Sequence, residues 1–182
     1  VDLLDVGVTA ANIAVTGTNI DLLGTSYVTT TSGTITFTGA VDLDVAGGTV
    51  TVNTSANNDN IQFTSTIDDN TAGNTALTLN AGTGNVDVGG NIGGTTDIGA
   101  FTVSATATQV DLANVEVTSG NIAVTGGNID LNGTSYTTTT SGNITFTGAV
   151  DLTAGAATTT VDSSSGNGNI NFTSTIDDDN AG

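Results

Sequence analysis

Two clusters of acidic residues are the part of this sequence best suited to binding chemistry. One cluster contains Asp68 and Asp69, and the other, at a corresponding place further along the chain, contains Asp177, Asp178 and Asp179. Each cluster follows an isoleucine, as the first residues of a loop after a strand would. Clustered carboxylate and carbonyl oxygens are the ligands that Ca²⁺ prefers. The clusters predict a Ca²⁺ site, and solvated loop acids are the alternative.

Most other reactive side chains are missing. The 182 residues include no Lys, Arg, His or Cys. This excludes Ser-His-Asp and Cys-His nucleophiles, Schiff-base lysines and imidazole bases, and also disulfides and zinc, copper or iron sites. Asp68 with Asp69 is the one carboxylate pair that could hydrolyse a glycoside, but a loop of small residues offers no aromatic platform for a sugar. We therefore predict a protein that is not an enzyme and that has no cofactor other than Ca²⁺.

A second set of aspartates lies at the centres of short apolar-polar-apolar triplets. Such residues point away from the core, because side chains alternate between the two faces of a strand. If some were in register on stacked strands about 4.8 Å apart, their like charges would repel, and salt or a divalent ion would reduce the repulsion. The sequence thus predicts a dependence of stability on salt, and the alternative is that these acids only maintain solubility. The residues are Asp21, Asp42, Asp87, Asp111, Asp130 and Asp151.

Threonines and tyrosines suggest two further kinds of site. Outward threonines, as in Thr29 to Thr31 and Thr137 to Thr140, could order water on a flat face like that of an ice-binding solenoid. The triplets do not repeat Thr-x-Thr at a fixed position from one coil to the next, so β-branched strand formation is the simpler interpretation. Tyr27 and Tyr136 recur at matching positions, which indicates core packing, with a carbohydrate platform as the alternative.

The elements that position these residues follow from an internal repeat. Val1 to Gly73 matches Val110 to Gly182 without a gap, at an offset of 109 residues. This pattern is the signature of a repeat array, with one long repeat in residues 1–109 and part of a second in residues 110–182.

Each long repeat contains triplets such as Ile35-Thr36-Phe37 and Ile61-Gln62-Phe63, separated by Gly, Asn and Thr. Strands this short do not form stable free hairpins, and their spacing of about 7 to 15 residues suits three strands per turn of a coil. We predict an all-β fold, a parallel β-solenoid with roughly triangular coils of about 22 residues, and about five coils in each 109-residue repeat. Asparagines that precede the triplets, such as Asn60 and Asn85, predict ladders of side-chain amides at the corners, and the alternative is that they only form turns.

Charge and hydropathy limit the classes of partner that the chain can bind. A formal charge of −18 with no positive side chain repels nucleic-acid phosphates and anionic lipids. No apolar run approaches the roughly 18 residues of a membrane span. The sequence predicts neither a nucleic-acid partner nor direct membrane insertion of this segment.

Two glycine-asparagine motifs and a longer segment resemble a known class of protein. The motifs Gly142-Asn143-Ile144-Thr145-Phe146 and Gly168-Asn169-Ile170-Asn171-Phe172, with the segment from Ala76 to Gly94 (ALTLNAGTGNVDVGGNIGG), resemble giant bacterial surface proteins of the filamentous haemagglutinin type. The resemblance implies a secreted adhesin or exoprotein built from parallel β-helix repeats. The chain departs from that family by lacking Lys and Arg, and no binding residue is transferred.

The expected function is that of a structural shaft of an extracellular fibre or surface adhesin, located outside the cell or at its surface. Its expected partners are other copies of itself, end to end or side by side, or neighbouring cell surfaces. The alternatives are a ligand-binding adhesin module that recognises carbohydrate in a calcium-dependent way and, less strongly supported, an ice-binding solenoid.

Overall fold

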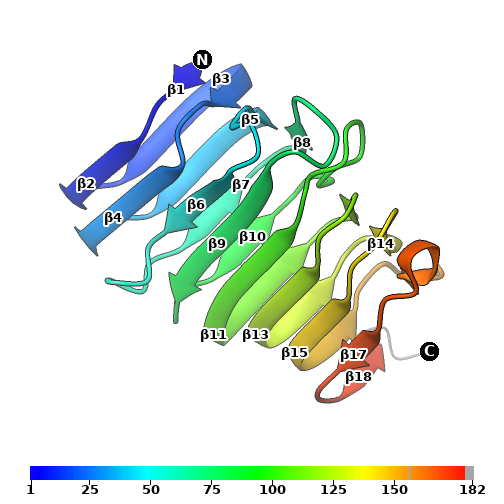
Figure 1. The fold of residues 1–182 in the computed structure, drawn as a ribbon. Coiled ribbons are helices and arrows are strands. Elements are labelled where there is room, and N and C mark those ends of the chain that lie inside the picture. The colour runs from blue at the N-terminus through cyan, green and yellow to red at the C-terminus, as the bar shows by residue number, and fades with distance from the viewer. Residues whose placement is uncertain (156, 179–182) are drawn as a thin grey trace.

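The computed structural model describes residues 1–155 and 157–178, and these form an all-β structure of short strands (Figure 1). The strands are β1 (Asp2–Leu3), β2 (Val6–Ala10), β3 (Ile13–Leu22), β4 (Ser26–Ser32), β5 (Ile35–Leu43), β6 (Thr49–Asn53), β7 (Ile61–Phe63), β8 (Ile67–Asp69), β9 (Ala76–Gly82), β10 (Val86–Val88), β11 (Phe101–Leu112), β12 (Val115–Val117), β13 (Ile122–Leu131), β14 (Ser135–Thr138), β15 (Ile144–Leu152), β16 (Thr160–Asp162), β17 (Ile170–Phe172) and β18 (Ile176–Asp178). One short 3-10 helix, η1 (Ser164–Gly166), follows β16.

The strands form three parallel ladders that run from one end of the stack to the other. Ladder A contains the first halves of β3 and β5, then β7 and β10, then the second halves of β11, β13 and β15, and finally β18. Ladder B contains β1, the second halves of β3 and β5, then β8, the bridge residues Ile92 and Ile98, and β12, β14 and β16. Ladder C contains β2, β4, β6 and β9, the first halves of β11, β13 and β15, and β17.

The chain visits ladders B, C and A in turn, and each round is one coil. About eight coils with a spacing near 22 residues are stacked in this way, which confirms the predicted parallel β-solenoid. The ladders continue across the boundary between the two long repeats, because β11 pairs with β10 on one side and with β13 on the other.

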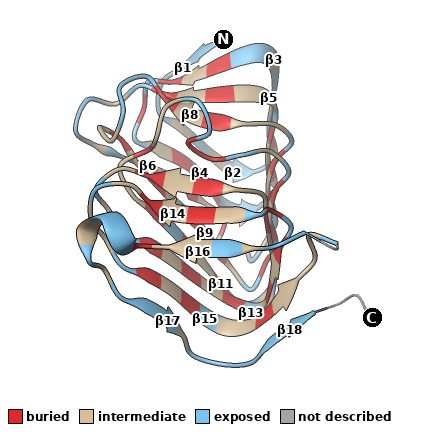
Figure 2. Cartoon of the chain, turned by 90° about the vertical axis from the view of Figure 1, so that its right-hand side faces the viewer, coloured by how far each residue is buried: buried red, intermediate tan, exposed pale blue. Residues whose placement is uncertain are grey.

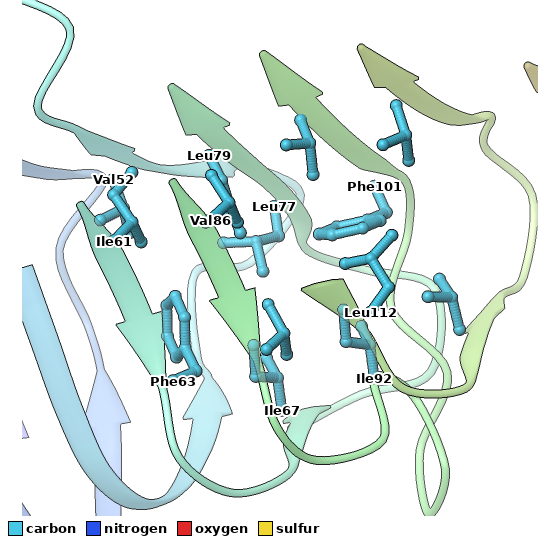
Figure 3. Packing of buried hydrophobic residues seen from close by; sticks show 14 of the residues in the cluster. Val52, Ile61, Phe63, Ile67, Leu77, Leu79, Val86, Ile92, Phe101 and Leu112 are labelled. Carbon is cyan, nitrogen blue, oxygen red and sulfur yellow. The ribbon is translucent and has the colours of Figure 1, made fainter. Parts of the chain in front are cut away.

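The core lies inside the stack and is built from the outer residues of the triplets. In β7 and β10 the two outer residues are buried and the middle residue is only partly buried. Buried positions line up from coil to coil (Figure 2), and their side chains fill the space between the ladders (Figure 3). The rings of Phe37 and Phe63 are stacked with centroids 4.9 Å apart, and Tyr27 meets Phe37 edge-on at 6.0 Å. Burying these apolar side chains is the main force that holds neighbouring coils together.

A glycine allows each of the strands β5 and β15 to turn a corner from one ladder to the next. Gly39 and Gly148 have φ angles of 127° and 135°, a region that other residues rarely adopt. A Cβ atom at either position would also clash with the carbonyl oxygen of a glycine in the coil below, Gly17 or Gly126. The sharp corner and the close approach of two coils both require glycine.

The corner asparagines differ from the prediction in what they bond to. Their side-chain oxygens accept hydrogen bonds from backbone N–H groups of the next coil, as from Asn85 to Asn60 (2.9 Å) and from Asn143 to Asn121 (2.8 Å). The expected contacts between side-chain amides are replaced by side-chain-to-backbone bonds, because a corner leaves backbone N–H groups outside the ladders that need an acceptor.

Candidate functional site: the aspartate stripes

The outward aspartates form two rows along the solenoid, each confined to one ladder. We call the row on ladder B stripe 1; its neighbours pair in the order Asp2, Asp21, Asp42 and Asp68. We call the row on ladder A stripe 2; its neighbours pair in the order Asp87, Asp111, Asp130, Asp151 and Asp177. The sequence predicted that six of these side chains would point outward, and the structure places them in register on successive coils together with Asp2, Asp68 and Asp177. The six are Asp21, Asp42, Asp87, Asp111, Asp130 and Asp151.

The four residues of stripe 1 and the last four of stripe 2 correspond to each other at the 109-residue offset. Paired strands are about 4.8 Å apart, so neighbouring carboxylates are close enough to repel each other. Because the chain contains no Lys or Arg, no cationic side chain offsets this repulsion.

Two carboxyl groups of the stripes have raised pKa values, with burial as the first cause and the neighbouring carboxyl groups as a further one. The pKa of Asp111 is raised first by burial and then by the charge of Asp130, with which it shares a hydrogen bond. The pKa of Asp21 is raised first by burial, then by a hydrogen bond with Asp2 and by the charges of Asp2 and Asp42. The pairs Asp2–Asp21 and Asp111–Asp130 are equivalent in the two repeats, so the same contact between two carboxyl groups forms twice.

Side-chain amides supply the hydrogen-bond donors that cationic residues would otherwise provide. Asn19 donates to Asp21 at 2.7 Å, and the equivalent Asn128 donates to Asp130 at 2.7 Å. Gln109 bridges two coils by donating to Asp111 at 3.0 Å and to Asp130 at 2.5 Å. These bonds hold the carboxylates in place without removing their charge.

The predicted Ca²⁺ cluster at Asp68 and Asp69 is split between two sides of one strand. Both residues lie in β8, and Asp68 belongs to stripe 1, whereas Asp69 is buried with only 3% of its surface exposed. Asp69 accepts hydrogen bonds from the backbone N–H groups of Asn74 (2.9 Å) and Thr75 (2.6 Å). Asp68 accepts from Thr95 (2.8 Å) and Thr96 (3.1 Å). The two carboxylates therefore organise two different loops, and they do not face one ion or one glycosidic bond.

In the second repeat, Asp177 continues stripe 2, and Asp178 follows it at the end of β18. The third acid of that predicted cluster, Asp179, lies outside the described residues. Within residues 1–155 and 157–178, no group of three or more acidic side chains is placed so that it could hold one metal ion.

Ladder C carries two rows made mostly of small polar side chains, which were not recognised from the sequence. Thr51, Thr78 and Thr102 are in register on three successive coils, and the row continues through Ala123 and Thr145. A second row beside it runs through Asn53, Asn80, Ser104, Thr125 and Thr147. The signal was hidden because the partners of each threonine are set by coil stacking, which the lengths of the loops decide.

Both tyrosines are fully buried, as core packing predicted, and the structure does not place them as carbohydrate platforms. The Tyr27 hydroxyl donates to the carbonyl of Leu3 (2.7 Å) and accepts from the N–H of Gly24 (3.1 Å). Tyr136 makes the equivalent bonds to Leu112 (2.9 Å) and Gly133 (3.0 Å).

A shallow groove of about 340 Å³ lies on ladder A where the small side chain of Thr36 is followed by Gln62 and Asp87. Gln62 donates to Asp87 at 2.9 Å across this groove. Its lining is polar or aliphatic, so it could hold a small polar molecule but offers no ring for a sugar to stack on.

In comparisons with known proteins, no family model, curated protein or solved structure matches the chain. Among the described residues, no helix is long and apolar enough to cross a membrane.

Proposed function

We propose that this chain is part of the shaft of an extracellular fibre or surface adhesin and that its role is mechanical. The observation that carries the proposal is the unbroken passage of the ladders from the first repeat into the second. Strand β11 belongs to both repeats, since its first half pairs with β9 and β13 and its second half pairs with β10 and β13.

The core is equally continuous across this boundary. Phe101, the last aromatic residue of the first repeat, is fully buried and pairs with Leu77 below and Ile122 above. Further copies of the repeat would therefore extend one stack of coils and would not add separate domains. Stability in such a stack accumulates through contacts between neighbours, so length itself is stabilising.

The composition is consistent with a location outside the cell. A chain without Lys or Arg has no cleavage site for trypsin-like proteases, and a chain without Cys does not depend on redox conditions for its fold. A large negative charge keeps an exposed fibre soluble.

Electron microscopy of arrays with one, two and three additional copies of residues 1–109 would test the proposal. From β1 to the first half of β11, one repeat contains fourteen strand segments, with the stretch from Ile92 to Ile98 counted as one, and these make four and two-thirds coils. Each copy should therefore add about 22 Å of length at constant width. Particles that grow in width, or that form separate globular bodies joined by linkers, would contradict the shaft.

A second candidate function, binding to an ordered water surface such as ice, is supported by the paired rows on ladder C. Threonine, serine and asparagine side chains there repeat about every 4.8 Å along the stack and about 7 Å along each strand. Ice recrystallisation assays would test this function, with Thr78→Tyr to disrupt the rows and Asp87→Asn on ladder A as the matched control. Retained growth of ice crystals in the presence of the unmodified chain would exclude it.

A further inference from the structure

We infer that the 109-residue repeat is out of phase with the coil by one third of a turn, so consecutive copies present the same surface on different faces of the shaft. The inference deepens the proposed function, because it specifies how the shaft displays its surface to neighbouring molecules.

Equivalent residues in the two repeats lie on different ladders. Asp42 is in the second half of β5 on ladder B, whereas its equivalent Asp151 is in the second half of β15 on ladder A. Tyr27 lies in β4 on ladder C, whereas Tyr136 lies in β14 on ladder B. Each segment of the second repeat has therefore moved by one ladder in the same direction.

The local structure around the equivalent residues nevertheless stays the same. Tyr27 meets Phe37 edge-on with centroids 6.0 Å apart, and Tyr136 meets Phe146 at 6.1 Å. The stacked pair Phe37–Phe63 has its counterpart in Phe146–Phe172, with centroid distances of 4.9 Å and 5.1 Å. The second repeat is thus a copy of the first that has been translated and rotated, and it has not been repacked.

The cause is the number of strand segments in one repeat. From β1 to the first half of β11 the chain passes through fourteen segments, counting the stretch from Ile92 to Ile98 as one because both isoleucines bridge to ladder B. Fourteen is not a multiple of three, so the next copy begins one ladder short of a complete coil. The prediction of about five coils per repeat is close in length, but it would have kept equivalent residues on one face.

This phase distributes the acidic stripe around the shaft. Stripe 1 occupies ladder B in the first four coils, and stripe 2 occupies ladder A from the fourth coil onward. In a longer array a third copy would place its stripe on ladder C, and one face would repeat only after three copies. Every side of the shaft would then carry aspartate stripes, so a second copy of the shaft approaching from any side meets like charge.

Distances between spin labels in the full chain would test the phase. The chain has no cysteine, so a pair of introduced cysteines provides the only two sites for spin labels. The first pair is Asp42→Cys with Asp151→Cys, which are equivalent residues separated by four and two-thirds coils, or about 22 Å along the axis. The control pair is Asp42→Cys with Asp162→Cys, which share ladder B five coils apart, or about 24 Å.

If the inference holds, the equivalent pair gives the longer distance although it is closer along the axis, because its labels point from different faces. An equivalent pair no longer than the control pair would overturn the inference and leave the stacked shaft intact. A control distance far from about 24 Å would refute the stack itself and the inference with it. Thermal melting of each labelled variant confirms that the compared proteins are folded.

Discussion

At the scale of single residues, the fold depends on a few positions where neighbouring coils come close together. Gly39 is the clearest, since its φ angle of 127° and the carbonyl oxygen of Gly17 both exclude a side chain. Gly148 repeats the arrangement in the second copy. Other glycines, such as Gly7, have open space where a Cβ atom would be.

Gly39→Ala should therefore destabilise the protein by about 1–3 kcal/mol from its backbone conformation alone, with a further cost from the clash. Gly7→Ala is the matched control, and it should change the free energy of unfolding by less than about 0.5 kcal/mol. Urea denaturation of the two variants measures both values. Equal stability of Gly39→Ala and the unmodified protein would contradict the corner geometry.

A single aspartate within a stripe should be destabilising. Asp42 lies between Asp21 and Asp68 on adjacent coils of ladder B. Asp42→Asn removes one charge from this row, so at low ionic strength it should stabilise the fold by about 0.2–1 kcal/mol. In molar salt, where the Debye length is about 3 Å, the gain should largely disappear. A gain that is independent of salt would point to a cause other than repulsion within the stripe.

At the scale of elements, the stripes connect stability to pH. The folded-state pKa values of Asp21 and Asp111 are raised by burial and by neighbouring carboxyl groups. The folded state therefore binds protons more tightly than the unfolded state does, and its stability falls as the pH rises through these raised values.

Denaturation in dilute solution should show greater stability near pH 4, close to the ordinary pKa of aspartate, than at neutral pH. The variant with both Asp21→Asn and Asp111→Asn should show a flatter dependence, because it lacks the two groups that take up protons. Stability that increases steadily from pH 4 to neutrality would show that the stripes do not control the pH response.

Packing between coils can be tested at two equivalent positions. Phe63 is fully buried between coils, whereas its equivalent Phe172, in β17 at the end of the stack, is only partly buried. Phe63→Ala should cost about 3–5 kcal/mol, and Phe172→Ala should cost clearly less. Similar costs at the two positions, measured by thermal or urea unfolding, would contradict the stacking order.

Local rules explain which features of these elements could be predicted. The alternation in Ile61-Gln62-Phe63 identifies a strand and its buried face from three residues, and the structure confirms that face. The pairing of coils depends on loops, and the stretch from Ile92 to Ile98 contributes to ladder B through isolated bridges without a recognisable triplet. The phase of the repeat and the row through Thr51, Thr78 and Thr102 were therefore beyond sequence reasoning.

The acidic cluster illustrates the same limit. Asp68 and Asp69 were interpreted as loop residues that could share an ion, but both continue the strand that begins at Ile67. Adjacent residues of a strand point to opposite sides, so one joins stripe 1 and the other is buried beneath the loop that contains Asn74 and Thr75.

At the scale of the whole molecule, the central claim is that all coils belong to one stack whose strands run across its long axis. Diffraction from aligned arrays of the 109-residue repeat tests this most directly. A stacked solenoid should give a strong reflection near 4.8 Å along the fibre axis, because the strand spacing lies in that direction. A 4.8 Å reflection perpendicular to the axis would mean that the strands run along the fibre, and it would contradict the solenoid shaft.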